Sequence, residues 1–176
     1  RELGAINVGG NANGTLNTTA TVIAAQADAN LANNSAAAAT VVTEPFINIA
    51  TASATLTAQS FSPPNGAIDA GETVTVILRL RNAGNISTRN LVGTLATNAN
   101  VLPVPPNNPQ TYGVLAPSGF PVGRSFSFTA SGTNGQTITA TLLLRDGTTN
   151  YLPVNFSFTL PNTQGFANPG AVDIPD

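Results

Sequence analysis

Apolar and polar side chains alternate along most of residues 46–160, and this period of two is typical of β-strands with one buried face. In residues 73–81, Val74, Val76, Leu78 and Leu80 alternate with Thr, Ile and Arg side chains. The same pattern predicts long strands at 124–130, 136–146 and 151–160, and shorter ones at 47–59, 91–95 and 112–115.

The alternation also predicts which side chains point into a core. Beyond residues 73–81, the predicted core residues are Phe126, Phe128, Ile138, Ala140, Leu142, Leu144, Leu152, Val154, Phe156, Phe158 and Leu160. The four Phe side chains form an aromatic stripe that we assign to the core. Pro153 cannot donate a hydrogen bond to a neighbouring strand, so it favours an edge position for residues 151–160.

Segments rich in Gly, Pro, Asn and Asp separate the predicted strands, as turns require. About seven strands with such turns predict an all-β fold, an antiparallel immunoglobulin-like β-sandwich over residues 44–161. Its core would consist of Val, Leu, Ile and Phe, because the chain has no Trp and no Cys for a disulfide.

Residues 1–43 have a different pattern. The segments "TLNTTATVIAA" and "SAAAATVV" predict two strands joined by "QADANLANN". Two strands are too few to bury a core alone. Four consecutive Ala at 36–39 would also allow a short helix, but the flanking Asn, Ser, Thr and Val favour extended chain. Residues 162–176 carry turn and linker signals and predict an extended C-terminal tail.

The composition excludes several classes of function. The 176-residue chain has no Cys, His, Met or Trp, and its six basic residues are all Arg. The usual transition-metal sites, Ser-His or Cys-His nucleophiles and Schiff-base lysines are therefore impossible. A formal net charge of −2 gives no basic surface for nucleic acid, and no apolar run reaches the ~18 residues of a membrane helix. Without Met, we expect a processed or excised piece of a longer product.

Only 8% of the residues are charged, against roughly a quarter in ordinary soluble domains. Thr, Asn, Ala and Ser take the place of the charged residues, and a surface of hydroxyls and amides suits proteins that pack side by side. Such a composition is unusual for a cytoplasmic protein.

Two acids, Asp69 and Glu72, flank Gly71 just before the strand at 73–81. Paired carboxylates can hold a metal ion or act as acid and base on a sugar. They can also close a turn, in which Gly71 takes a positive φ, Asp69 caps the turn and Glu72 pairs with an Arg. We favour the turn, and we expect no catalytic residue, no enzyme activity and no resident cofactor.

An oxygen-rich loop, with Asp28, Asn30, Asn33 and Asn34, is the one candidate metal site, and the ion would be calcium. Tight calcium sites usually use several carboxylates, and this loop offers one. The alternative is that these side chains accept hydrogen bonds from backbone N–H groups of their own turn, and we favour this alternative.

Three arginines gather near one predicted strand. Arg79 and Arg81 share its polar face, and Arg89 lies just beyond the following turn. They form either a docking patch for a glycan or a neighbouring subunit, or a charged surface that keeps the sheet soluble and discourages edge pairing. We favour the second interpretation.

Several segments resemble modules of exported bacterial proteins. Residues 1–43, with Asp28, Asn30, Asn33 and Asn34 in the pattern Asp-x-Asn-x-x-Asn-Asn, resemble the C-terminal half of the conserved repeat found in tandem in bacterial and archaeal surface proteins. The segment "AIDAGETVTVILRLRNAGNISTRNLVGTL" resembles the start of the cell-adhesion-related bacterial domain (CARDB-like), and "YGVLAPSGFPVGRSFSFTA" is similar to immunoglobulin-like modules of secreted bacterial proteins. "FANPGAVDIPD" is similar to the opening of the jelly-roll domain that follows subtilisin-like proprotein convertases. These resemblances imply an exported multi-module protein, extracellular or at the cell surface, with a structural or adhesive role.

A pair of strands with open edges is suited to completing the sheet of another chain. We therefore predict a fibre or stalk subunit that exchanges strands with identical subunits or neighbouring modules, or else an excised fragment whose missing half lies elsewhere. The subunit-contact candidates are Thr15, Leu16, Thr19, Thr21, Val22, Ile23, Val41 and Val42. The alternatives are an adhesion or carbohydrate-binding module, through loops 103–110 and 117–123, and an accessory domain of a secreted multidomain protein.

Overall fold

The computed structural model describes residues 13–23 and 25–162. Contacts between Cα atoms divide the chain into two units, Arg1–Phe46 and Ile47–Asp176. This division lies close to the predicted boundary between residues 43 and 44. All but the first residue of the predicted tail at 162–176 lies outside the described residues.

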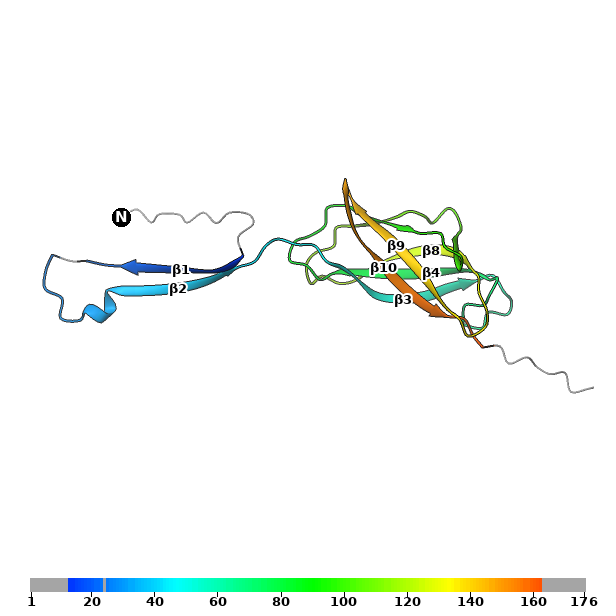
Figure 1. Cartoon of the computed structure of the whole chain (residues 1–176), viewed down its shortest axis with the longest axis horizontal. Coiled ribbons are helices and arrows are strands. Elements are labelled where there is room, and N and C mark those ends of the chain that lie inside the picture. The colour runs from blue at the N-terminus through cyan, green and yellow to red at the C-terminus, as the bar shows by residue number, and fades with distance from the viewer. Residues whose placement is uncertain (1–12, 24, 163–176) are drawn as a thin grey trace, which may run out of the picture. The chain divides into compact units, whose positions relative to one another are not determined.

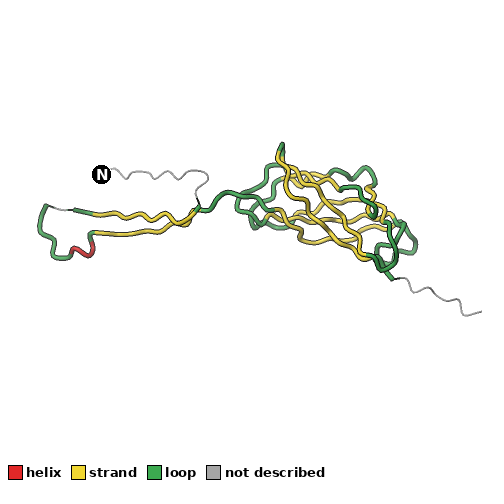
Figure 2. Tube along the Cα trace, viewed as in Figure 1, coloured by secondary structure: helices red, strands yellow, loops and turns green. Residues whose placement is uncertain are grey.

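The second unit is an antiparallel β-sandwich, as predicted, with four strands in each sheet (Figures 1 and 2). Its strands are β3 (Ile49–Gln59), β4 (Thr73–Asn82), β5 (Leu91–Leu95), β6 (Val101–Pro103), β7 (Gln110–Gly113), β8 (Val122–Ala130), β9 (Thr137–Asp146) and β10 (Thr149–Thr159). One sheet has the order β3-β4-β8-β6, and the other has the order β10-β9-β5-β7. The immunoglobulin-like assignment stays a prediction.

The core lies between the two sheets and contains the predicted alternating residues. On β4, Val74, Val76, Leu78 and Leu80 are all at most 1% exposed. The Phe side chains of β8 are fully buried, and the ring of Phe128 lies 6.1 Å from that of Phe158 on β10. The aromatic stripe is therefore part of the core, because the two strands that carry it belong to facing sheets.

One predicted core residue is wrong. Leu152 is 86% exposed, whereas Val154 and Phe156 on the same strand are buried. The pairing of β10 with β9 shifts between Tyr151 and Val154, around Pro153. A register shift turns the preceding side chains to the other face, so Tyr151 packs against the core in place of Leu152. The edge position predicted from Pro153 is confirmed.

Two of the short strands also differ from the prediction. β6 was not predicted, because its three residues lie in the proline-rich segment at 101–109 that indicates a turn. β7 begins two residues before the predicted strand at 112–115 and ends at Gly113, which has a φ of +79°. The remaining strands agree with the sequence pattern to within about two residues, the usual uncertainty of strand ends.

The first unit is a two-stranded antiparallel ribbon of β1 (Gly14–Thr21) and β2 (Ser35–Val42). Its register is continuous from Gly14 opposite Val42 to Thr21 opposite Ser35. The four Ala at 36–39 are extended rather than helical, as favoured from their neighbours. A 3-10 turn, η1 (Leu31–Asn33), lies in the connecting loop and was not predicted (Figure 2).

Tyr112 connects the two sheets of the sandwich. It is 2% exposed on β7, and its hydroxyl donates to the carbonyl of Leu78 on β4 at 2.9 Å. Its ring lies 6.4 Å from that of Phe126. Burial raises the pKa of Tyr112 far above its ordinary value of 10.0, and the positive charge of Arg124 opposes part of this rise.

This pKa predicts a loss of stability in alkali. Because the folded-state pKa lies above the unfolded value, the unfolded chain loses this proton first, and the stabilisation that is complete below about pH 10 declines as the pH rises further. Urea unfolding between about pH 8 and pH 11 should therefore give a falling free energy of unfolding. The Tyr112→Phe variant should have a lower free energy of unfolding at pH 8, and this free energy should fall less steeply as the pH rises. An identical pH slope in both proteins would contradict this assignment.

Candidate functional site

The carboxylate pair forms a turn at the entry to β4. Gly71 has a φ of +84°, which glycine tolerates best. The backbone N–H of Glu72 donates to the carbonyl of Asp69 at 3.1 Å, and Oε2 of Glu72 accepts the N–H of Asp69 at 3.1 Å. These two reciprocal bonds close the turn that the sequence favours.

Glu72 has a structural role that the sequence did not predict. Its side chain is fully buried, and Oε1 accepts the backbone N–H of Phe61 at 3.1 Å. The amide of Gln59 lies 3.4 and 3.5 Å from the two carboxylate oxygens. The expected pairing with an Arg is wrong, because β3 and the following loop supply these donors. A buried carboxylate whose oxygens are both occupied ties the loop to the sheet and has no access to a substrate.

The candidate calcium loop contains local hydrogen bonds. Asp28 Oδ1 accepts the N–H of Asn30 at 2.9 Å, and Asn30 Oδ1 accepts the N–H of Ala32 at 3.3 Å. The carbonyl of Asn34 accepts the N–H of Val22 at 2.8 Å, which continues the β1–β2 ladder. Within residues 13–23 and 25–162, no three His, Cys, Asp or Glu side chains form a group able to hold a metal ion. These contacts are those expected of Asx turns, and the calcium site stays a prediction.

The subunit-contact candidates lie on both faces of the ribbon. Cross-strand partners share a face of the ribbon. One face therefore carries Leu16 beside its partner Thr40 and Val42 beside its partner Gly14. The other face carries the pairs Thr15–Val41, Thr19–Ala37 and Thr21–Ser35. Leu16 and Val42 are half-buried, and the other candidates are exposed, with Val22 at 47%, Val41 at 73% and Ile23 at 94%.

The three arginines have different neighbours in the described sandwich. Arg79 Nη1 donates to Thr55 Oγ1 on β3 at 2.9 Å. Arg81 lines a hollow of about 370 Å³ together with Ser118 and Gly119, from the predicted binding loop 117–123. Arg89 lines a different hollow. Arg79 and Arg81 share the outward face of β4, and both interpretations of the arginines stay predictions.

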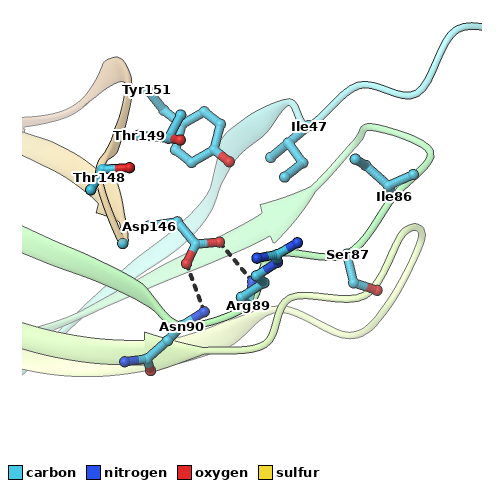
Figure 3. Close-up of a pocket in the computed structure, with 10 residues that line it drawn as sticks. Ile47, Ile86, Ser87, Arg89, Asn90, Asp146, Thr148, Thr149 and Tyr151 are labelled. Carbon is cyan, nitrogen blue, oxygen red and sulfur yellow. Dashed lines mark hydrogen bonds between the residues drawn. The ribbon is translucent and has the colours of Figure 1, made fainter. Parts of the chain in front are cut away.

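The hollow at Arg89 has a volume of about 650 Å³ and lies beside the turn between β9 and β10 (Figure 3). Ile47 and Tyr151 lie together on one side of it, and Asp146 and Arg89 lie on the other. Ile86 extends the apolar part of the wall. We call this hollow the Tyr151 groove.

Side-chain to backbone hydrogen bonds hold the backbone of the Tyr151 groove. The carboxylate of Asp146 accepts the backbone N–H groups of Arg89 at 2.6 Å and Asn90 at 2.8 Å. Thr88 Oγ1 donates to the carbonyl of Gly113 at 3.0 Å and accepts the N–H of Leu115 at 2.7 Å. The segment that carries Arg89 is thereby attached to both β9 and the chain after β7, so its backbone is fixed before any ligand arrives.

Asn82 fixes the other end of the same segment. It is 2% exposed, and its Nδ2 donates to the carbonyls of Ile86 at 2.7 Å and Leu115 at 3.0 Å. Its Oδ1 accepts the N–H of Gly84 at 2.9 Å. The sequence indicates a turn after residue 82, but it gives no sign that this Asn lies inside the protein.

Partial burial raises the pKa of Tyr151 above 10.0, the negative charge of Asp146 adds to the rise, and the positive charge of Arg89 opposes it. A phenol is protonated at neutral pH even at its ordinary pKa, so the Tyr151 hydroxyl is both a donor and an acceptor there. Of the residues that form this groove, the sequence singled out only Arg89, because the others meet only through the sandwich topology.

Glu72→Ala tests the structural role of the buried carboxylate. The N–H groups of Phe61 and Asp69 would lose their acceptor, so the free energy of unfolding should fall by about 3 kcal/mol. Glu72→Gln keeps one carbonyl acceptor and should cost less, on the order of 1 kcal/mol. Urea titrations of the three proteins give these differences, and an Ala variant as stable as the parent would disprove the role.

Calcium titration distinguishes an ion site from Asx turns in the ribbon loop. If Asp28 and Asn30 act as local acceptors alone, millimolar calcium should leave the amide NMR signals of residues 25–34 and the melting temperature unchanged. A ligand that binds the folded state must raise stability, so a saturable calcium-dependent rise that Asp28→Asn abolishes would establish the ion site instead.

Among the described residues, no helix has the length and hydropathy needed to cross a membrane. Neither a protein-family model nor a curated protein sequence matches the chain. The resemblances to surface-protein modules therefore stay predictions.

Proposed function

We propose that this chain is a non-catalytic structural module of an extracellular bacterial surface protein, a fibre or stalk subunit that associates through the β1–β2 ribbon. The observation that carries the proposal is a contrast between strand edges. An edge strand presents unpaired N–H and C=O groups, which pair with other chains unless bulges, prolines, charges or short length prevent it. The edges of the two units differ in these respects.

All four edge strands of the sandwich have protective features. β3 has two register shifts, between Thr51 and Ser53 and between Leu56 and Ala58. β10 contains Pro153 and a register shift. β6 has three residues and ends in Pro103, and β7 has four residues. None of these edges offers a long, regular ladder to another strand.

The ribbon has none of these features. β1 and β2 contain no charged residue and no proline, and their eight cross-strand pairs run without a register shift. Within the described residues, each strand pairs only with the other, so each has one open edge. A two-stranded ribbon is marginally stable in water by itself, and adding strands would pair its backbone groups and cover its exposed Val and Ile side chains.

Ribbon-to-ribbon pairing also favours a fibre over a closed dimer. If β1 of one copy pairs with β2 of the next, both edges are used in every copy, and such a heterologous contact repeats into a filament unless its rotation closes a ring. Two-fold pairing of like edges leaves the other edge open. The extracellular setting is supported by the low charge and by the surface of Thr, Asn and Ser side chains.

Thr19→Lys tests the proposal at the centre of the ribbon. A Lys on an edge strand opposes pairing because its charge must be desolvated in the extended sheet. The apparent association constant from sedimentation velocity should fall by at least about tenfold, and filaments in electron micrographs of the parent should disappear. Ser53→Lys makes the same charge change on the bulged edge of β3 and should change association by less than about twofold. A parent chain that is monomeric at every concentration would rule out the fibre.

A further inference from the structure

The Tyr151 groove has one apolar wall and one polar wall. Ile47, Ile86 and the ring of Tyr151 provide the apolar wall. Ser87, Arg89 and Asn90 provide hydroxyl, guanidinium and amide groups, and Thr148 and Thr149 add two hydroxyls from the β9–β10 turn. In Figure 3, Tyr151 and Ile47 face Asp146 and the guanidinium of Arg89 across the hollow, whereas the side-chain amide of Asn90 and the hydroxyl of Ser87 point away from its centre. A ligand that fits must therefore present both a C–H surface and several hydroxyl groups.

We propose that the Tyr151 groove binds a neutral pyranose sugar, with one C–H face of the ring against Tyr151 and Ile47 and the hydroxyls toward Arg89 and the threonines of the β9–β10 turn. A pyranose has this amphipathic character, because its axial C–H groups form apolar faces and its hydroxyls project around the rim. Aromatic rings supply large contact surfaces for such faces. The planar guanidinium group donates several N–H groups, which match the acceptor oxygens of adjacent sugar hydroxyls.

The charged groups that line the groove favour a neutral ligand. Arg89 and Asp146 are its two charged lining residues, and their charges cancel. Each attracts the ion that the other repels, so neither a phosphate nor an ammonium group gains a net attraction from the pair. The carboxylate of Asp146 already accepts two backbone N–H groups, so its charge is fixed in the wall.

The groove is also preorganised and of suitable size. Its 650 Å³ lies within the roughly 300–1,000 Å³ typical of small-ligand sites. The contacts of Asp146, Thr88 and Asn82 fix the segment at 86–90, so little ordering is needed on binding. The site differs from the loops expected from sequence, and it does not depend on self-association through the ribbon.

The test uses the full chain and a panel of methyl hexopyranosides, the α- and β-anomers of methyl glucoside, galactoside and mannoside. Amide NMR spectra should show saturable shifts confined to residues 47–49, 86–90 and 146–152, with at least one sugar binding in the millimolar range. Methyl glucuronide, glucosamine and inorganic phosphate serve as charged comparators. They should bind at least about fivefold more weakly than the preferred neutral sugar.

Tyr151→Ala should weaken sugar binding by about tenfold, through loss of the aromatic face. Arg89→Gln should weaken it by about fivefold. Two control variants change similar side chains outside the groove. Phe120→Ala removes an aromatic side chain that is 96% exposed, and Arg81→Gln makes the same charge change as Arg89→Gln. Both controls should stay within about twofold of the parent. The spectra of the unliganded variants show whether each remains folded.

Several outcomes would overturn the proposal. These are the absence of saturable shifts with every neutral sugar, tighter binding of phosphate or glucuronide, and shifts that lie outside the groove. If Phe120→Ala and Tyr151→Ala weaken sugar binding equally, the sugar contacts exposed aromatic side chains in general and not this groove. Filament formation is measured separately, so failure of sugar binding leaves the proposed fibre function unaffected.

Discussion

Backbone hydrogen bonding at the ends and edges of strands is the constraint on which the rest of this structure depends. Every buried N–H and C=O group needs a partner, and a strand obtains these partners only from a neighbour or a side chain. In the sandwich the neighbours are present, and the remaining edges are short, bulged or interrupted by proline. In the ribbon each strand has one neighbour, so the unpaired edges favour further association.

The same constraint explains the buried Glu72 and Asn82 and the partly buried Asp146. All three accept backbone N–H groups where the ladder is interrupted. Such groups resemble functional residues in a sequence, because carboxylates beside glycines also occur at catalytic and metal sites. Their burial and their occupied oxygens identify Glu72 and Asn82 as supports. Asp146 is only partly buried, so it both supports the chain and contributes charge to the groove.

The two proposals rest on different parts of the chain. The ribbon has small, uncharged side chains and a regular register, which favour repeated pairing of identical chains. The Tyr151 groove combines aromatic, aliphatic and hydrogen-bonding side chains on a rigid β-sandwich. A surface fibre whose subunits carry a sugar site would combine both features, yet each proposal can fail without affecting the other.

The sequence by itself determined every strand of the sandwich except β6, because alternation with a period of two reports which face of each strand is buried. It therefore predicted the sandwich, its inward residues and the edge position of β10. It did not predict the exposure of Leu152, because the register shift around Pro153 depends on pairing with β9. The Tyr151 groove also depended on tertiary structure, since Ile47, Arg89 and Tyr151 are far apart in sequence. Only the packing of the two sheets brings such residues together, and no local pattern encodes that contact.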